Sequence, residues 1–373
     1  MKFLIISHVE HIQDEDKIYG YGPYVKEMNL WLKYVDEVRI VAPIKKGKPD
    51  PIDLAYVHEK IRFDKVPVFN LVTNAAKIKT VLTLPYIFMR IFFAMMWAEH
   101  IHLRCPGNMG LLGAVAQMFF PKKIKTVKYA GNWDPKSQQP RSYRMQKSII
   151  SNVSLSKNMQ VLVYGAWPDQ STNIKEFFTA TYRDSEKKEL LPRNLEDEIR
   201  LVFVGALSPG KRPMIALKAV EELLSHGVNA RLDLMGEGGQ RGDLEAYIKE
   251  KSLEKQVTLH GNQSSDFVKA KFQNAHFLIL MSKSEGWPKV VAEAMFWGAI
   301  PITSNVSCVN YMIGEGSRGA LVEADEKSVS NAIEDYVGDK SLYEKTSLDA
   351  MKWSRQFTLE SFEDAIKGVL NGK

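Results

Sequence analysis

Cysteine is scarce in this chain of 373 residues: Cys105 and Cys308 are the only two, and neither lies in a CxxC or Cys/His spacing. Neither a disulfide framework nor a zinc site is therefore indicated, and a reducing cytoplasm is the expected location. No Gly-x-Gly-x-x-Gly follows the first apolar run, which argues against a nicotinamide-dependent dehydrogenase. The sequence also lacks internal repeats and low-complexity tracts.

No apolar run is both long enough and free of charge, as an obvious membrane span would be. Residues 81–98 come closest, but Arg90 lies in the middle of the run and Pro85 near its start. Because a central arginine costs a few kcal/mol in a bilayer, we expect a buried helix, with contact at a membrane surface as the alternative. Residues 1–8 have too few apolar side chains for a signal peptide and predict a buried first strand.

What the sequence does have is the composition of an ordinary globular protein, with 45% hydrophobic and 25% charged residues. Its 373 residues exceed what one hydrophobic core usually organises, so two domains are expected. The 50 basic and 44 acidic residues leave a net charge of +6. This mild excess favours anionic small molecules and gives no indication of nucleic acid as a partner.

Short apolar runs alternate with longer amphipathic segments, which is typical of parallel strands joined by crossover helices. The predicted strands are residues 3–7, 37–42, 101–104, 126–130, 160–164, 199–204, 231–235, 257–260, 277–281, 299–303 and 320–322. The predicted helices are residues 23–34, 84–97, 109–119, 142–151, 213–226, 239–251, 267–273, 290–296, 327–337 and 359–370.

The strand–helix series is interrupted once, where residues 181–200 become strongly charged and carry a proline. Such a stretch is typical of a linker between domains. The expected fold is therefore α/β with two doubly wound domains. The boundaries are residues 1–182 for the first domain, 183–198 for the linker, 199–357 for the second domain and 358–373 for a final helix.

The most informative segment is residues 284–295, SEGWPKVVAEAM, which follows a predicted strand and opens a helix. The carboxyl edge of a parallel sheet is where such folds bind ligands. Gly286 allows a close turn and Pro288 suits the first helical turn, whose free amides favour a diphosphate. Glu285 and Glu293 could accept hydrogen bonds from the hydroxyl pairs of a sugar and a ribose. Spacing alone leaves open that Glu285 caps the helix and that Glu293 is a solvated surface residue.

The stretch SEGWPKVVAEAMFWGAIPI resembles the E-x7-E signature of family-four glycosyltransferases, also called glycosyl transferases group 1. Four further stretches, which precede this one in the chain, occur in the order typical of that family: residues 203–211 (FVGALSPGK), 234–238 (LMGEG), 259–261 (LHG) and 275–281. The resemblance covers residues 199–370. It implies the GT-B architecture, in which two Rossmann-like domains face a central cleft and the last helix packs back on the first domain.

The resemblance also implies a role for each matching residue. Lys211 would neutralise the donor diphosphate, Glu285 would meet hydroxyls of the transferred sugar, and Glu293 would hold the ribose. A lysine suits this place because negative charge grows on the diphosphate as the glycosidic bond breaks. The wider donor-binding set is Gly20, Gly22, Ser208, Arg212, Gly236, Gly286, Trp287, Pro288, Lys289 and Val290.

One position departs from the family pattern. The family commonly has an arginine just after the first glycine of the second domain, and this chain has Ala206 there. Neutralisation of the diphosphate would then depend on Lys211, with Arg212 or Lys289 as helpers. The alternative is that donor hydrolysis and transfer are weakened.

The first domain resembles the family less closely. Gly20-Tyr21-Gly22-Pro23 stands where many relatives have a glycine loop under the donor phosphates, with a plain turn as the alternative. Arg104 lies near the place of a histidine in many relatives and is expected to act as a catalytic residue that contacts donor or acceptor. The expected acceptor-binding residues are His8, Tyr24, Asn132, Trp133 and Asp134, with packing as the alternative for the two aromatic ones and a structural role for His8.

The function that the resemblance implies is that of a retaining, metal-independent hexosyltransferase with no cofactor. Its donor would be a UDP- or GDP-sugar and its acceptor a saccharide or a lipid-linked saccharide. The setting would be bacterial surface polysaccharide or glycoconjugate biosynthesis, in the cytoplasm or at the inner face of the cytoplasmic membrane. Two alternatives stay open: a GT-B nucleotide-sugar epimerase, and a catalytically weak nucleotide- or glycan-binding subunit.

Overall fold

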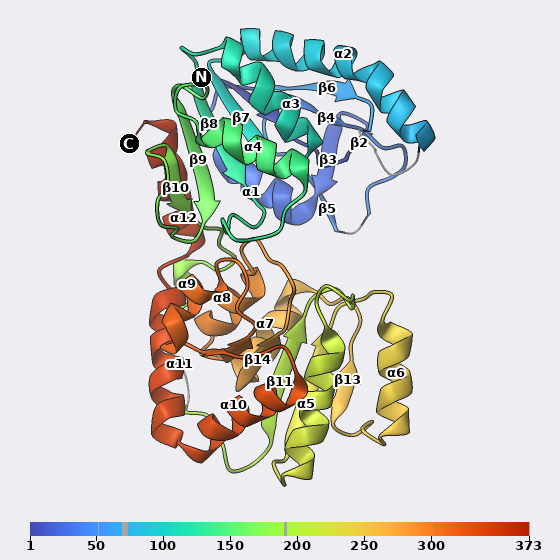
Figure 1. Ribbon diagram of the computed structural model, residues 1–373, viewed down its shortest axis with the longest axis vertical. Coiled ribbons are helices and arrows are strands. Elements are labelled where there is room, and N and C mark those ends of the chain that lie inside the picture. The colour runs from blue at the N-terminus through green and yellow to red at the C-terminus, as the bar shows by residue number, and fades with distance from the viewer. Residues whose placement is uncertain (51, 69–73, 190–191, 373) are drawn as a thin grey trace. The chain divides into compact units, whose positions relative to one another are not determined.

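The computed structural model describes residues 1–50, 52–68, 74–189 and 192–372. The chain forms two compact units, one of Met1–Phe178 and Phe362–Lys373 and the other of Thr179–Ser361. We call them the amino-terminal and the carboxy-terminal unit. Each contains a parallel sheet flanked by helices (Figure 1).

The sheet of the amino-terminal unit has the strand order β10-β9-β8-β7-β1-β4-β6. The chain runs from β1 to β4 and β6 on one side, and then returns through α2 to β7 on the other side of β1. The strands are β1 (Lys2–Ile6), β4 (Glu37–Pro43), β6 (Ile61–Val66), β7 (His100–Cys105), β8 (Ile124–Tyr129), β9 (Met159–Tyr164) and β10 (Ile174–Phe177). The helices are α1 (Gly22–Leu32), α2 (Asn74–Trp97), α3 (Asn108–Ala116), η1 (Gln117–Phe119), α4 (Arg141–Ser151) and α12 (Leu359–Leu370).

A small antiparallel sheet of β2 (His11–Asp14), β3 (Lys17–Tyr21) and β5 (Asp53–Ala55) also belongs to this unit. None of its strands was predicted, and neither were the edge strands β6 and β10. Helix α2 also begins earlier than expected, so that Pro85 lies inside the helix and does not start it. In the described part of the chain, no helix has the length and hydropathy of a membrane span.

The sheet of the carboxy-terminal unit has the order β13-β12-β11-β14-β15-β16. Its strands are β11 (Ile199–Val204), β12 (Ala230–Met235), β13 (Val257–Leu259), β14 (Phe277–Leu280), β15 (Ile300–Thr303) and β16 (Ala320–Leu321). Its helices are η2 (Asp184–Glu186), α5 (Pro213–Ser225), α6 (Arg241–Glu250), α7 (Ser265–Asn274), α8 (Lys289–Phe296), α9 (Val309–Ile313), η3 (Gly314–Gly316), α10 (Glu326–Gly338) and α11 (Lys340–Ser354). The strand order reverses between β11 and β14, which is where open α/β sheets bind ligands.

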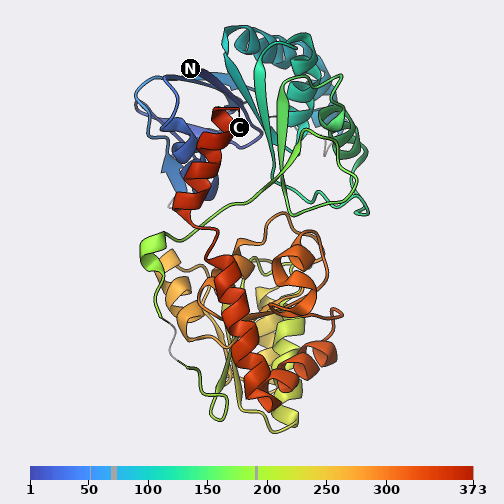
Figure 2. The same cartoon turned by 90° about the vertical axis from the view of Figure 1, so that its left-hand side faces the viewer.

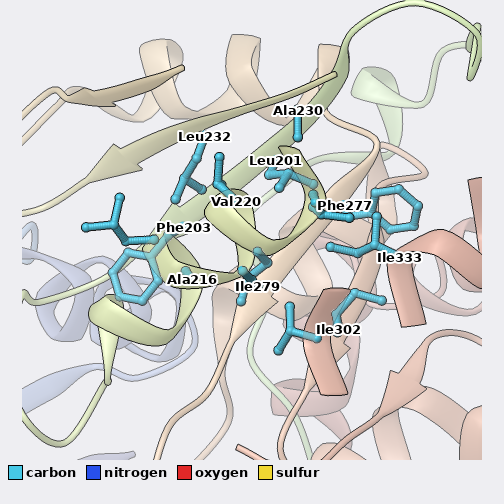
Figure 3. Close-up of a cluster of buried hydrophobic side chains, with 14 of the residues drawn as sticks. Leu201, Phe203, Ala216, Val220, Ala230, Leu232, Phe277, Ile279, Ile302 and Ile333 are labelled. Carbon is cyan, nitrogen blue, oxygen red and sulfur yellow. The ribbon is translucent and has the colours of Figure 1, made fainter. Parts of the chain in front are cut away.

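The core of the carboxy-terminal unit lies between its sheet and helices α5 and α10 (Figure 3). Leu201 and Phe203 of β11 meet Val220 of α5, and all three are almost fully buried. Central parallel strands are covered on both faces, which explains their continuous apolar sequences. Burial of each large apolar side chain contributes roughly 1.5–3 kcal/mol.

The boundaries between the units differ from the expected ones. Residues 183–198 were predicted to be a linker, but they belong to the carboxy-terminal unit. Arg193 anchors this segment, because its guanidinium donates to the carbonyl oxygens of Phe272 and Gln273, both at 3.3 Å. Residues from Phe362 onward belong to the amino-terminal unit, where α12 lies beside the amino-terminal elements (Figure 2) and Glu363 pairs with Lys33 at 3.0 Å.

Candidate functional site

Two glycine turns meet at the carboxyl edge of the sheet in the carboxy-terminal unit. Gly205 follows β11 and Gly236 follows β12, and the Gly205 amide donates to the Met235 carbonyl at 3.0 Å. Gly236 has a φ of 142°, and a Cβ atom there would collide with the carbonyl oxygen of Gly205. Glycine is therefore required for this close approach, which holds the β11–α5 loop in place.

The β11–α5 loop is wound tightly around Ser208. The Ser208 carbonyl oxygen accepts hydrogen bonds from the amides of Lys211 and Arg212, each at 3.0 Å. Arg212 has a left-handed φ of 52° just before Pro213 begins α5. The Lys283 amide donates to the Gly210 carbonyl at 2.8 Å, so the tip of this loop is tied to the loop that follows β14.

Lys211 and Glu285 form an ion pair between these two loops. Their strands, β11 and β14, are neighbours at the point where the strand order reverses. The Glu285 side chain is only 10% exposed and that of Lys211 is 30% exposed. A carboxylate so deeply buried needs a compensating charge, and Lys211 supplies it. Glu285 does not cap α8, whose N-cap is Pro288, so the capping alternative is wrong.

The elbow between β14 and α8 is fixed by side chains beneath it. The Gly286 carbonyl oxygen lies 3.0 Å from the Cys308 Sγ atom, which donates to it. Trp287 is buried and stacks on Trp353 at 6.2 Å between ring centroids. Since no side chain caps α8, the amides of its first turn keep the polarity that favours an anion.

Glu293 lies within α8 and is not a solvated surface residue. Its side chain is half-buried, and its Oε1 atom accepts a hydrogen bond of 2.7 Å from the Thr181 hydroxyl. Burial, and then the charge of Glu293, raise the pKa of the Tyr182 hydroxyl. Thr181 was not predicted as a site residue, and no sequence pattern marks it.

Ala206 is exposed on the same loop as Lys211. It stands where the family resemblance leads one to expect an arginine, and its methyl group offers no charge. The half-buried Lys289 begins α8, close in sequence to Glu285. The positive groups of this edge are therefore distributed differently from the expected pattern.

The amino-terminal unit brings together three of the predicted residues where its own strand order reverses. Arg104 of β7 lies over the Tyr24 ring, with 5.2 Å from the guanidinium carbon to the ring centroid. The exposed His8 follows β1, and a Cβ atom at Gly107 would come within 2.9 Å of its Nδ1 atom. Arg104 also lies 3.9 Å from the carboxylate of Glu27.

The predicted acceptor-binding residues differ in the solvent exposure of their side chains. Tyr24 and Trp133 are each only 3% exposed, which fits packing and leaves no ring face for a sugar. The Trp133 indole donates to Gln170 at 2.9 Å. Asn132 and Asp134 accept hydrogen bonds of 2.8 Å from the amides of residues 134 and 136, so they shape their own turn.

The predicted phosphate loop at Gly20 and Gly22 has another use in the fold. Gly20 lies in β3, and the Gly22 amide donates to the Ile52 carbonyl at 3.0 Å. A Cβ atom at Gly22 would collide with that same carbonyl oxygen. The plain-turn alternative fits these contacts, because Gly22 is needed for close packing and its amide is already engaged.

The described residues contain no group of three or more His, Cys, Asp or Glu side chains placed to hold a metal ion. An Asp-x-Asp triplet does occur at Asp14-Glu15-Asp16, but it forms the exposed turn between β2 and β3. It lies in the amino-terminal unit.

Comparison with known proteins gives a family for the unit that holds this edge. Residues 184–353 match the family model described as glycosyl transferases group 1. The alpha-D-kanosaminyltransferase of Streptomyces kanamyceticus is 25% identical over 50% of this chain and 49% of its own length. A Campylobacter jejuni alpha-1,4-N-acetyl-D-galactosaminyltransferase, named for a diphospho-undecaprenol-linked saccharide, is 26% identical over 46% of this chain and 47% of its own. The chain thus spans about half the length of these curated relatives.

The whole chain is similar in fold to solved glycosyltransferases. Anabaena Alr3699/HepE, solved in complex with UDP and glucose, superposes with a TM-score of 0.68 at 13% identity and with full coverage of both chains. That similarity shows the GT-B fold, with two Rossmann-like domains. The match to the glycosyl transferases group 1 family is confined to residues 184–353, within the carboxy-terminal unit.

Proposed function

We propose that this protein is a glycosyltransferase that moves a hexose-type sugar from a UDP- or GDP-sugar to a saccharide or lipid-linked saccharide. The transfer would retain the anomeric configuration and need neither a metal nor a cofactor. The observation that carries the proposal is the Lys211–Glu285 ion pair at the switch point of the sheet, within the residues that match the family.

The ion pair is a donor site in its unliganded form. A nucleoside-diphosphate sugar brings phosphate oxygens for Lys211 and sugar hydroxyls for Glu285, so each side chain can exchange its partner for a ligand group. The exchange keeps the buried carboxylate satisfied, because hydroxyls donate to it in place of the ammonium. Phosphate is a strong acceptor for a lysine, which acts here as a point charge.

The remaining donor contacts follow from the same edge. Glu293 accepts hydrogen bonds from the ribose hydroxyls in place of Thr181. The backbone N–H groups of residues 286, 287, 289 and 290 face the diphosphate at the start of α8. Ser208, Arg212 and Gly236 hold the loops that carry Lys211.

The chemistry that suits this site is a front-face displacement. The bond between the anomeric carbon and the diphosphate breaks, and the acceptor oxygen attacks from the same side. The departing phosphate oxygen takes the proton of the acceptor hydroxyl. Lys211 stabilises the negative charge that develops on the diphosphate, which is the largest effect available to such a site. Arg104 of the other unit is proposed to contact donor or acceptor.

The biological setting is part of the proposal. The Campylobacter relative is named for an undecaprenol-linked saccharide, which supports a lipid-linked acceptor and a role in bacterial surface polysaccharide or glycoconjugate biosynthesis. We place the protein in the cytoplasm, in peripheral contact with the inner face of the cytoplasmic membrane.

Nucleotide binding tests the site directly. Thermal unfolding is measured with UDP, GDP and ADP, and with their sugars, for the wild type and for Glu293→Ala and Lys211→Ala. One nucleotide should stabilise the wild type and neither variant, while both variants unfold cooperatively without ligand. Equal stabilisation of all three proteins would contradict the site. The anomeric configuration of the product, read by NMR, then decides between retention and inversion.

One observation favours a second candidate, a catalytically weak nucleotide- or glycan-binding subunit. Ala206 leaves the donor edge with less positive charge than the family pattern provides. Such a subunit would bind a nucleotide tightly but turn over no donor across a panel of acceptors. An epimerase, by contrast, would interconvert a free nucleotide sugar with no acceptor present.

A further inference from the structure

Helix α2 presents an apolar stripe on its outer side. Leu82, Tyr86, Met89, Phe93 and Met96 follow one another at intervals of three or four residues, so they lie on one side of the helix. Their exposed fractions run from 46% for Met89 to 75% for Leu82. Figure 1 shows α2 at the outer edge of the amino-terminal unit. We call these five side chains the α2 stripe.

The stripe is not needed for the packing of the helix. The opposite side of α2 carries Ile87, Ile91, Ala94 and Met95, all of which are fully buried in the core of the unit. A helix at the surface of a globular domain normally has polar residues opposite such a face. A contiguous row of large exposed apolar side chains therefore indicates an interaction surface.

The apolar surface extends beyond α2 onto the neighbouring turn. Phe119 of η1 is 63% exposed. The Phe92 ring lies between it and the stripe, with centroid distances of 5.9 Å to Phe119 and 6.4 Å to Phe93. The patch is thus built from two elements and is broader than a single row of side chains.

The charges around the patch are mainly positive. Helix α2 contains no acidic residue. Lys122 is exposed just after Phe119, and the Lys123 ammonium donates to the Met96 carbonyl at 2.7 Å, so it marks the carboxyl end of the helix. Glu99, which follows α2, is exposed, whereas Asp64 is buried against Arg90.

We infer that the α2 stripe and Phe119 lie on the surface of an anionic lipid bilayer, with α2 parallel to the membrane plane. Apolar side chains bordered by lysines suit this surface, because the rings enter the acyl boundary while the ammonium groups meet lipid phosphates. A second copy of the chain fits the patch less well, since two copies would bring Lys122 and Lys123 of each together. The inference names the surface for the peripheral contact proposed above and does not depend on Lys211 or Glu285.

Vesicle flotation tests the inference with the full chain. The protein is mixed with vesicles of phosphatidylcholine alone, or of phosphatidylcholine and phosphatidylglycerol in equal parts. The wild type should float with the anionic vesicles, and the double variant Met89→Gln/Phe93→Gln should bind them at least about tenfold more weakly, given the apolar area removed. The matched control is Leu342→Gln/Leu348→Gln, which changes side chains of similar exposure in α11 and should bind like the wild type.

Two further readouts separate the alternatives. Lys122→Gln should weaken binding to the anionic vesicles and make that binding less sensitive to salt, because one of the screened charge contacts is gone. The inference is overturned if the wild type stays with the unbound protein, or if the double variant floats like the wild type. It is also overturned if sedimentation shows a dimer that the double variant dissociates. Nucleotide-induced stabilisation, measured without vesicles, reports separately on the donor site.

Discussion

The Thr181 hydroxyl donates a hydrogen bond of 2.7 Å to the carboxylate of Glu293, across 112 positions of the sequence. Thr181 thus holds the acceptor atom that the proposed function assigns to the ribose. If a ribose hydroxyl takes its place, the nucleotide competes with a bond of about 1 kcal/mol.

Thr181→Val removes this competitor and should tighten nucleotide binding about threefold to fivefold, as measured by calorimetry with the nucleotide that stabilises the wild type. Thr181→Ser keeps the hydroxyl and is the control, with unchanged affinity. Weaker binding by Thr181→Val would mean that the hydroxyl assists the ligand, contrary to the proposed exchange.

The Lys211–Glu285 pair can be measured by a double-mutant cycle. Lys211→Met leaves a largely buried carboxylate without its cation and should lower the free energy of unfolding by about 1–3 kcal/mol. Adding Glu285→Gln should recover part of that loss. Both single variants should lower transfer by about a hundredfold or more, because each removes a donor contact. Urea unfolding and transfer assays check the two halves, and additive losses would argue against a coupled pair.

Ala206→Arg should restore charge to the donor edge. The site is exposed, so the longer side chain has room. We expect nucleoside-diphosphate affinity to rise severalfold, with a gain that shrinks at high salt. Ala206→Gln, similar in length but neutral, should show no such gain. If both variants bind alike, the added charge does not reach the phosphates.

Stability should fall in mild acid because of His276. Its Nδ1 atom accepts a hydrogen bond of 2.9 Å from the Arg200 amide, and its Nε2 atom lies 3.0 Å from the Asn194 carbonyl oxygen, so the ring is neutral. Burial, and then the charge of Arg193, lower its pKa to about 4. In the unfolded chain His276 therefore becomes protonated as the pH falls through about 6.5. In the folded chain it stays neutral until the pH reaches about 4.

The free energy of unfolding of the carboxy-terminal unit should accordingly be steady above pH 7 and fall by about 2 kcal/mol at pH 5 through this one group. His276→Asn can keep both hydrogen bonds without titrating. The decrease in its free energy of unfolding between pH 7.5 and pH 5, measured by urea unfolding, should therefore be smaller than that of the wild type by that amount. Equal losses in both proteins would assign the acid sensitivity to other groups. His11 and His100, also with pKa values lowered to about 4 by burial, lie in the other unit.

The sequence predicted the central strands well because they are continuous apolar runs. The bounds expected for β11 agree with the structure at both ends. Helix α11 escaped prediction because its buried side includes Thr346, Ser347, Ala350 and Ser354, which are too small or polar to produce an apolar period. The short strands of the small antiparallel sheet carry polar residues and have no alternation to read.

The candidate site likewise contains residues that could be predicted from the sequence and contacts that could not. Lys211 and Glu285 could be singled out from motifs, but their ion pair depends on two loops brought together by neighbouring strands. The bond from Thr181 to Glu293 joins a connecting segment to a helix, and nothing in the local sequence encodes it. Tyr24 and Trp133 were predicted to bind the acceptor but are buried. The sequence could not tell these two cases apart, because an aromatic residue after a strand has the same pattern whether it is buried or contacts a ligand.

The chain passes between the two units twice, at residues 178–179 and again at 361–362. The amino-terminal unit therefore cannot be complete until the ribosome has delivered the last residues of α12, although nearly all of its sheet is made first. During synthesis the carboxy-terminal unit can fold before the amino-terminal unit is complete. The amino-terminal unit still lacks Phe362, whose ring packs on Phe177 and Phe178. A premature stop before Phe362 would remove the ring that packs on both Phe177 and Phe178.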